Sequence, residues 1–376
     1  MENEKKEAVL IHDLLQSEEF KNQKLDLPIA LGKTYLNKPN IADLAKMPHL
    51  LIGGATGLDN SILLNDIIIS LLYSKRPDEL KFVLFDPSMV EFSQYEDIEN
   101  QYLAKSPEVE DPVVTDINDM VTTLEALCIE MDNRFHTLHD TKTRNIKEYN
   151  KKVENSELDF SEYKTMPYIV LVIQDWDHLI LTAGKEVEFP IARIAQKGRA
   201  VGIHIIIATQ RQSTNVITGI IKANFPARIA FKVSSAIDSK TILDEKGAEN
   251  LGPCGDMLIY NSAPLIRAQA ALADMDEISL VCEHISKQPV PQFPYYLPIT
   301  GRDEKIIEEP KDPLFKECVE FMVETNIVSV SALQRKFKIG YNRAVKIMKQ
   351  LEVAGIVSPP TRFFKMKKED LNNLEL

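Results

Sequence analysis

Five short apolar runs within residues 49–233, separated by longer stretches of helical periodicity, constrain the fold more than any other feature of this sequence. The runs are HLLIGG, ELKFVLFDP, PYIVLVIQD, GIHIIIATQ and ARIAFKV, and each ends at turn-forming or polar residues. Helical spacing of apolar residues occurs between them, at 61–73, 116–136 and 187–200. This alternation predicts an α/β fold with a mostly parallel sheet and helices on both faces. Ligands of such sheets bind at the carboxyl ends of the strands.

Changes in composition divide the chain into four parts. Residues 1–45 are polar and mixed, and we interpret them as a segment that leads into a main domain at 46–287. A proline-rich run followed by a charged run, together 288–312, is typical of a linker. The remaining part, 313–376, predicts a small separate domain.

Three short helices and a β-hairpin are predicted in this last part, at 314–325, 331–337 and 342–354, followed by the strands of IVSPP and RFFKMKK. That order indicates a winged-helix domain, which contains a helix-turn-helix. Helical spacing predicts that its buried face includes Ala344, Ile347, Met348 and Leu351.

The formal net charge of −12 is unevenly distributed. From Lys311 to the end there are 12 Lys and Arg against 8 Asp and Glu, a charge of +4, which leaves −16 on the remainder. The overall acidity argues against a protein coated with DNA-binding charge. A basic module on an acidic body fits local contact with DNA, and it also fits a solvated basic surface.

The sequence has no feature of a membrane span, a secretory signal or a metal centre. No stretch approaches the ~18 consecutive apolar residues of a membrane helix. The first residues, MENEKKEAVL, are too charged for a signal peptide. The four cysteines lie far apart and outside any Cys/His cluster, so we expect reduced structural thiols. A cytoplasmic protein is the resulting expectation.

Several long segments of the sequence resemble the FtsK/SpoIIIE family of DNA translocases. They occur in the family's order over roughly 13–359, and they include IADLAKMPHLLIGG, IARIAQKGRAVGIHIIIATQRQS, VITGIIKANFPARIAFKVSS and LQRKFKIGYNRAVKIMKQLEVAGIVSP. The resemblance implies a RecA-like P-loop NTPase motor that uses ATP and Mg²⁺ and assembles as a hexameric ring around double-stranded DNA. It also implies a γ-type winged helix that reads short orienting sequences and contacts a site-specific recombinase.

The phosphate-binding loop, or Walker A motif, departs from the family pattern at two positions. The glycine before the lysine is Asp59, and the lysine itself is Asn60, so a carboxylate is added and a cation is removed beside a polyanion. At an effective dielectric constant of about 20, such a like-charge contact costs several kcal/mol. The change predicts weak ATP binding. The retained loop residues are Gly54, Thr56, Gly57 and Ser61.

The Walker B motif is degenerate as well. The run PYIVLVIQD aligns with the family strand that ends in Asp-Glu, where the Asp holds Mg²⁺ through water and the Glu polarises the attacking water. These positions are Gln174 and Asp175 here. A shift of one residue would place Asp175 in the metal role and Trp176 in the place of the base, so neither register restores both groups.

Three further positions bear on the same site. Gln210 matches the family's polar residue that senses the γ-phosphate, and Arg199 matches an arginine that reaches the neighbouring subunit's site. Packing at a strand end or on a helix surface is the alternative interpretation of both. Ala236 stands where the family usually has a lysine. Together with the changes at Asn60 and Gln174, this loss of a charged side chain predicts inefficient ATP hydrolysis.

The first residues of the second helix in a helix-turn-helix lie in the DNA major groove. Asn suits adenine there, and Arg suits guanine or phosphate. Lys346 and Lys349 replace an arginine and an acidic residue of the family, so base discrimination should be weaker or different. Use of the winged helix for protein contact alone is the alternative. The candidate DNA-binding residues are Arg335, Lys336, Lys338, Tyr341, Asn342, Arg343, Lys346 and Lys349.

Three functions remain open at this point. The leading hypothesis is a DNA-binding family member with impaired ATP hydrolysis, active in chromosome or DNA segregation or transfer. It would work in a homo- or hetero-oligomeric ring, with an active translocase or a recombinase as partner. The second is an active translocase with a rearranged nucleotide site. The third is a protein-interaction scaffold that uses neither DNA nor nucleotide.

Overall fold

The protein forms two compact units, Met1–Ile299 and Thr300–Leu376. The computed structural model describes residues 9–22, 24–159, 163–261, 264–290 and 295–299 of the first unit, and Thr300 at the start of the second. In the second unit it describes 312–325 and 330–339, together with the residue pairs 343–344, 347–348, 350–351, 357–358 and 363–364.

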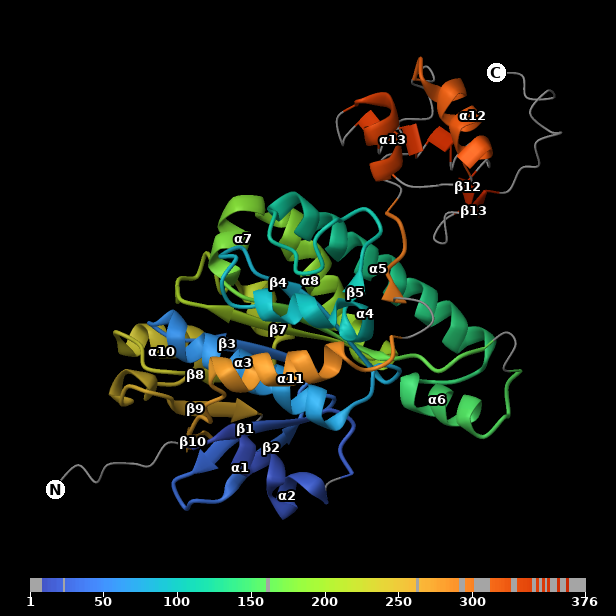
Figure 1. Ribbon diagram of the computed structural model, residues 1–376. Coiled ribbons are helices and arrows are strands. Elements are labelled where there is room, and N and C mark those ends of the chain that lie inside the picture. Colours follow the sequence, from blue (N-terminus) through green and yellow to red (C-terminus); the bar gives the residue numbers. More distant parts are fainter. Residues whose placement is uncertain are drawn as a thin grey trace. The chain divides into compact units, whose positions relative to one another are not determined.

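A single twisted sheet forms the centre of the larger unit (Figure 1). Within the described residues its strands are β1 (Pro28–Thr34), β2 (Pro39–Asp43), β3 (His49–Gly53), β4 (Leu80–Phe85), β6 (Tyr168–Ile173), β7 (Ile203–Thr209), β8 (Ala227–Ala230), β9 (Asp256–Asn261) and β10 (Ile266–Gln269). Their order is β2-β1-β10-β9-β8-β3-β7-β6-β4. The strands from β8 to β4 are mutually parallel and coincide with the five apolar runs. The predicted α/β fold with a mostly parallel sheet is therefore confirmed.

Four antiparallel strands extend the sheet beyond β8. β1 and β2 belong to the stretch 1–45, for which the sequence predicts only a lead-in segment. Ile29 and Leu31 of β1 are buried in the core of the larger unit. This stretch therefore forms part of the same sheet as the residues that follow it.

Helices cover both faces of the sheet, as predicted. Along β3, Leu50 and Ile52 face one hydrophobic cluster while Leu51 faces the other. The first cluster includes α3 (Gly57–Ser74) and α11 (Met275–Ser286), and the second includes α5 (Ile117–Asp140), α7 (Trp176–Ala183) and α8 (Lys185–Lys197) (Figure 1). The other helices are α1 (Ile11–Gln16), α2 (Glu18–Lys21), α4 (Glu99–Tyr102), α6 (Ile146–Glu154), α9 (Gly219–Asn224) and α10 (Ala236–Leu243), with 3₁₀ turns at Ser93–Ile98, Gly198–Val201 and Ala248–Asn250.

The three helices predicted in the main domain correspond to α3, α5 and α8, and a side-chain cap fixes the start of α5. α5 begins at Ile117 because the carboxylate of Asp116 accepts hydrogen bonds from the next free backbone N–H groups, at 2.8 and 3.2 Å. α3 begins at Gly57, four residues before the predicted start, because the loop after β3 turns directly into the helix.

Residues 295–297 pack against the larger unit, although the sequence places them in a linker. Strand β11 (Tyr295–Tyr296) pairs with β5 (Ala104–Lys105), and Leu297 is buried. Arg134 is 2% exposed and donates to the Tyr295 hydroxyl at 2.8 Å, to Glu130 at 2.7 Å and to two backbone carbonyls. The Tyr295 hydroxyl donates in turn to Glu130 at 2.6 Å. The larger unit therefore extends to Ile299.

The smaller unit contains α12 (Phe315–Thr325), α13 (Val330–Phe337) and a hairpin of β12 (Val357–Ser358) with β13 (Phe363–Phe364). α12 and α13 match two of the three predicted helices, and β12 and β13 match the predicted wing strands; most of the third helix, predicted at 342–354, lies outside the described residues. The four residues predicted for the buried face, Ala344, Ile347, Met348 and Leu351, lie in its hydrophobic core. They pack with Phe315, Val319 and Leu333.

None of the described helices combines the length and the apolar composition that a membrane crossing requires. All four cysteines are free thiols, and Cys254 is the exposed one. The described residues contain no group of His, Cys, Asp or Glu side chains arranged to hold a metal ion.

Replacing Arg134 by leucine should lower the stability of the larger unit strongly. The change leaves the half-buried Glu130 without its cation and deprives two carbonyls of their donor, and breaking such a pair typically costs about 3–5 kcal/mol. Arg193→Leu is the matched control because its ion pair with Asp132, at 2.6 Å, is exposed and worth at most about 1 kcal/mol. Thermal unfolding of both variants tests this. Equal losses of melting temperature would contradict the assignment of Arg134 as an anchor.

Candidate functional site

The loop between β3 and α3 lies at the carboxyl ends of the parallel strands. The Gly54 N–H donates to the Thr209 carbonyl at the end of β7, at 3.3 Å, and the Ala55 N–H donates to the Lys232 carbonyl after β8, at 2.9 Å. A Cβ added to Gly54 would lie 3.0 Å from Phe231 Cβ, so the close approach of β8 favours glycine here. Three neighbouring strands therefore fix the position of this loop.

Asn60, at the lysine position, points back into the protein. Its side chain is buried, at 1% exposure, and Nδ2 donates to the Thr209 carbonyl at 3.0 Å. Its Oδ1 has no hydrogen-bond partner among the described residues and lies near Gly54. The Asn60 amide N–H therefore bonds to the end of β7, and its Oδ1 remains as an acceptor without a partner beside the loop.

Asp59 ties the loop to a segment that is distant in sequence. One carboxylate oxygen accepts from the Gly255 N–H at 2.9 Å, and the other accepts from the Thr56 hydroxyl at 3.0 Å. The carboxylate lies in the first turn of α3, where the helix dipole favours negative charge. A bound phosphate would have to share this end of the helix with that charge.

Gln174 follows β6 directly and faces the loop. Its Nε2 donates to the Ser61 hydroxyl at 3.1 Å, and the same hydroxyl donates to the Gly57 carbonyl at 3.0 Å. Gln174 is 2% exposed, and its Oε1 has no hydrogen-bond partner among the described residues. The Ser61 side chain is therefore occupied by hydrogen bonds within the protein.

Asp175 and Gln210 lie together beside Gly57. Asp175 has a left-handed backbone, with φ 51°, and its carboxylate accepts from Gln210 Nε2 at 2.8 Å. A Cβ added to Gly57 would lie only 2.6 Å from the same Nε2, so the glutamine side chain packs directly over this glycine. The two residues that the sequence assigns to Walker B and to γ-phosphate sensing thus contact one another and the loop.

Negative charge gathers at this site. Burial raises the pKa of Glu91, and the carboxylates of Asp86 and Asp175 act in the same direction. Burial likewise raises the pKa of Asp175, with Asp177 and Asp86 adding to the shift. Asp86 is fully buried and accepts hydrogen bonds from the backbone of Ser88 and Glu91. The site therefore offers acceptor oxygens where a nucleotide site offers donors.

Trp176 belongs to the core. It is fully buried, and its indole N–H donates to the Val216 carbonyl at 2.9 Å. Ala236, at the family's lysine position, is the first residue of α10, whose N-cap is Ser235. Neither residue adds charge to the site.

Arg199 lies at the other end of the parallel strands. It lines a cleft of about 520 Å³ with Tyr168, the first residue of β6, and His204, near the start of β7. The loop between β3 and α3 lies at the carboxyl ends of these strands, about 20 Å away at 3.3 Å per residue. Arg199 therefore cannot reach the phosphate loop of its own chain.

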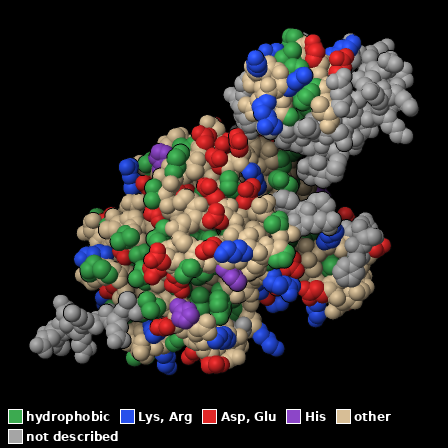
Figure 2. Space-filling view, in the orientation of Figure 1, with side chains coloured by type: hydrophobic (Ala, Val, Ile, Leu, Met, Phe, Trp, Pro, Cys, Tyr) green, Lys and Arg blue, Asp and Glu red, His purple; other side chains and the backbone are tan. Residues whose placement is uncertain are grey.

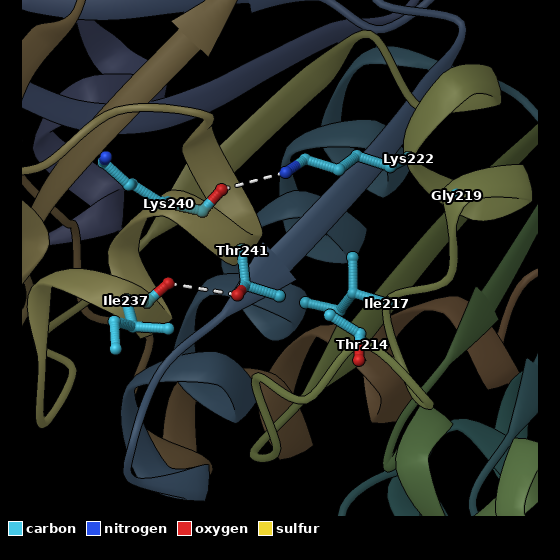
Figure 3. A pocket seen from close by; sticks show the side chains of 7 residues that line it. All are labelled: Thr214, Ile217, Gly219, Lys222, Ile237, Lys240 and Thr241. Atoms are coloured by element: carbon cyan, nitrogen blue, oxygen red, sulfur yellow. Dashed lines mark hydrogen bonds between the residues drawn. The ribbon is translucent and has the colours of Figure 1, made fainter.

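A second pocket, of about 340 Å³, lies between α9 and α10 (Figure 3). Lys222 Nζ donates to the Lys240 carbonyl at 2.9 Å across it and forms an ion pair with Asp244 at 2.6 Å. None of its lining residues belongs to the phosphate loop. They are Thr214, Ile217, Gly219, Lys222, Ile237, Lys240 and Thr241.

In the smaller unit, four of the candidate DNA-binding residues are described and all four are exposed. The Lys336 ammonium lies 5.6 Å from the centre of the Phe321 ring, and Lys338 has a left-handed backbone where α13 ends. Arg343 forms a bidentate pair with Asp312, with both contacts at 2.9 Å. Arg335 is the fourth. Tyr341, Asn342, Lys346 and Lys349 lie outside the described residues.

Gly255 and Gln212 contact the loop although the sequence does not identify them. Gln212 Nε2 donates to the Gly54 carbonyl at 2.9 Å. It lies two residues after Gln210, within the segment IARIAQKGRAVGIHIIIATQRQS that resembles the family, and this position is the only sequence feature that points to it. Gly255 is 196 residues from Asp59, and no local pattern predicts that contact.

Elsewhere on the larger unit, Figure 2 shows acidic and basic side chains interspersed over the visible face.

Comparison with known proteins gives consistent matches over both units. A sequence model described as "FtsK/SpoIIIE family" matches residues 10–214, and one described as "Ftsk gamma domain" matches residues 309–363. "DNA translocase FtsK" of Chlorobaculum tepidum is 44% identical over 368 residues, which are 94% of this chain and 44% of that protein. The Haemophilus influenzae protein of the same name is 42% identical over 380 residues, with 94% of this chain and 70% of that protein covered.

Among solved structures, the pCW3 conjugation coupling protein TcpA, in a monomer form with ATPγS, has a TM-score of 0.61 at 25% identity. The match covers 74% of this chain and 73% of TcpA. The larger unit thus has the fold of P-loop ATPase motors. The smaller unit matches the FtsK gamma domain, which is a winged helix.

Replacing Asp175 by asparagine should stabilise the larger unit. A carboxyl whose folded-state pKa is raised favours folding when protonated, and that contribution is present below its ordinary pKa of 3.8 and lost as pH rises through the raised value. We expect Asp175→Asn, which keeps the acceptor for Gln210, to raise the melting temperature at pH 7.5 by about 1–3 °C. The gain should vanish at about pH 4 or below.

Asp177→Asn is the matched control. Asp177 pairs with Arg211 at 3.3 Å and accepts from the Thr209 hydroxyl at 2.9 Å, so its neutralisation should lower the melting temperature. A loss of stability in Asp175→Asn at pH 7.5 would contradict the picture of a crowded acidic site.

Proposed function

This chain belongs to the FtsK/SpoIIIE family, and we propose that it is a double-stranded-DNA-binding motor subunit whose own ATP hydrolysis is impaired. Its motor part would be the larger unit, in which β1, β2 and residues 295–299 join the predicted range 46–287, and its DNA-reading part would be residues 313–376. Its setting would be chromosome or DNA segregation or transfer in the bacterial cytoplasm, at the nucleoid or septum through its partners. Those partners would be an active translocase in a mixed ring, or a recombinase.

The observation that carries the proposal is the orientation of Asn60. A phosphate loop needs a cation that reaches outward to the β- and γ-phosphates. At this position the chain has a neutral amide that is 1% exposed and whose donor is bonded to the Thr209 carbonyl. Turning it outward would leave that carbonyl without this donor and would still supply no charge.

The neighbouring residues support the same conclusion. Mg²⁺ needs the Ser61 hydroxyl and a Walker B carboxylate, but Gln174 is neutral and its amide is bonded to Ser61. Asp59 places a carboxylate in the first turn of α3, where the phosphates would lie. The residues at this site therefore fit ATP and Mg²⁺ poorly.

The alternative of an active translocase with a rearranged site draws on the intact backbone. Gly54 and Gly57 keep the close approaches that a phosphate loop requires, and α3 begins at Gly57 with its N-terminal N–H groups directed at the loop. These groups alone bind anions weakly. A protein-interaction scaffold is the third candidate, and the exposed basic side chains of the smaller unit favour DNA over it.

Those basic side chains suit phosphate contact. Arg335 and Lys336 are exposed in the last turn of α13, so their charge is available to a ligand. Arg343 differs from them, because its bidentate pair with the largely buried carboxylate of Asp312 already neutralises its charge within the chain.

Restoring the two Walker A residues should increase ATP affinity. We expect wild type to show no ATP binding at millimolar concentration and no DNA-stimulated turnover. The double variant Asp59→Gly/Asn60→Lys should bind at least tenfold more tightly, since it removes one negative charge and adds one positive charge. Isothermal titration with Mg²⁺–ATP measures this, and Ser61→Ala in the double-variant background is the control that should reduce the gain. Wild-type turnover near that of active relatives, abolished by Ser61→Ala, would sink the proposal.

Binding of duplex DNA by the full chain should depend on the smaller unit and on salt. Each phosphate contact contributes about −0.9 to the slope of log K against log salt, so Arg335→Ala/Lys336→Ala should weaken binding and make this slope shallower by about 2. Lys316→Ala, an exposed change on α12, is the control and should leave the slope unchanged. Affinity that is independent of salt in wild type would favour the scaffold.

A further inference from the structure

Two buried amide oxygens at the phosphate loop have no hydrogen-bond partner among the described residues. They are Asn60 Oδ1 and Gln174 Oε1, and their side chains are 1% and 2% exposed. The Thr209 carbonyl can only accept a hydrogen bond, so the atom of Asn60 that faces it is Nδ2, and Oδ1 is left beside the loop. A buried acceptor without a donor costs stability, so these oxygens favour a ligand that brings N–H groups.

Three carboxylates at the same site have no cation partner. Asp59, Glu91 and Asp175 are half-buried, and none forms an ion pair within the described part of the chain. Gln174 Nε2 donates to the Ser61 hydroxyl, and a hydrogen bond with the same side chain counteracts part of the rise in the pKa of Glu91. The charge of Asp175 adds to that rise, so the two carboxylates lie close together. Gln174, Glu91 and Asp175 therefore form one group of acceptors around Ser61.

Asp59 forms a second acidic position, in the first turn of α3. Each of its carboxylate oxygens accepts one hydrogen bond within the protein, and a carboxylate offers about four acceptor sites, so it can still accept from a ligand. Leu58, next to Asp59, is 70% exposed, and Val90, next to Glu91, is 66% exposed. Both acidic positions thus have apolar surface beside them, which suits the methylene groups of a long cation.

A linear polyamine has the chemistry that these residues require. Its ammonium groups carry positive charge and N–H donors, and methylene segments separate them. Carboxylates accept from such groups in charge-assisted hydrogen bonds. A divalent metal ion instead needs several converging oxygen ligands, and the described residues contain no group of three Asp, Glu, His or Cys side chains arranged for one. Phosphate groups are repelled by the same carboxylates.

We propose that the phosphate-loop site of this chain binds a linear polyamine in place of a nucleotide. One ammonium group pairs with Glu91 and Asp175 and donates to Gln174 Oε1. Another pairs with Asp59. This inference rests on the proposed loss of nucleotide binding, because phosphates and polyamine would occupy the same loop. The bound polyamine neutralises carboxylates that repel one another and gives the buried Gln174 oxygen its donor.

Isothermal titration of the full chain with spermidine, at pH 7.5 and without nucleotide or DNA, tests the proposal. Wild type should bind spermidine saturably, and its affinity should fall with added salt. Glu91→Gln/Asp175→Asn removes two carboxylates and should weaken binding by about tenfold or more. Glu154→Gln/Glu157→Gln is the matched control, because it removes the same charge from exposed residues at the end of α6, and it should bind as wild type does.

Two further variants separate a built site from general attraction to an acidic protein. Gln174→Leu removes the unpartnered oxygen and no charge, so it should weaken spermidine binding and leave the salt dependence unchanged. Asp59→Gly/Asn60→Lys, which places a cation in the loop, should lose spermidine binding as it gains ATP binding.

Three outcomes would overturn the inference. They are no spermidine binding by wild type, equal weakening in Glu154→Gln/Glu157→Gln, and displacement of spermidine by an equal concentration of Mg²⁺. ATP turnover, measured on the same samples, reports separately on the proposed function. Turnover overturns that function, whereas absence of both turnover and spermidine binding overturns only the polyamine site.

Discussion

The central position of β3 is the constraint on which the rest of the structure depends. Its backbone pairs in parallel with β7 on one side and β8 on the other, so Leu50 lies opposite both Ile206 and Ala227. All five of its residues are buried, which requires apolar cover on both faces. The loop between β3 and α3 therefore lies in the middle of the domain, next to the carboxyl ends of β6, β7 and β8. A site at this point follows from topology before any side chain is specified.

The side chains at that point then decide what the site can bind. The amide of Asn60 donates to β7, the amide of Gln174 donates to Ser61, and the Asp59 carboxylate holds the Gly255 N–H. Each replacement turns a group that would face a phosphate into one bonded within the protein. The donors are used internally and the acceptors remain.

The sequence predicts the parallel part of the sheet well because buried parallel strands are continuous apolar runs, rich in β-branched residues and bounded by turns. It predicts the helices through periodicity and caps such as Asp116. It does not predict β1, β2, β9 and β10, because these antiparallel strands carry mixed residues and are specified by pairing with one another in the fold. Nor does it predict that Asn60 turns inward or that Asp59 contacts Gly255, because both depend on atoms that only the fold brings together. The sequence shows the change of charge at Asp59 and Asn60, but it does not show which atoms these side chains contact.

The anchoring of Tyr295 on Arg134 has a consequence for the order of events during synthesis. Strand β5, at Ala104–Lys105, receives its partner strand only when Tyr295–Tyr296 has been made, roughly 190 residues later. At ribosomal rates of about 5–20 residues per second, this is a delay on the order of 10–40 s. During that time the Arg134 guanidinium and the sheet edge beside it lack their final cover. The larger unit therefore stays incomplete until translation has passed Tyr296.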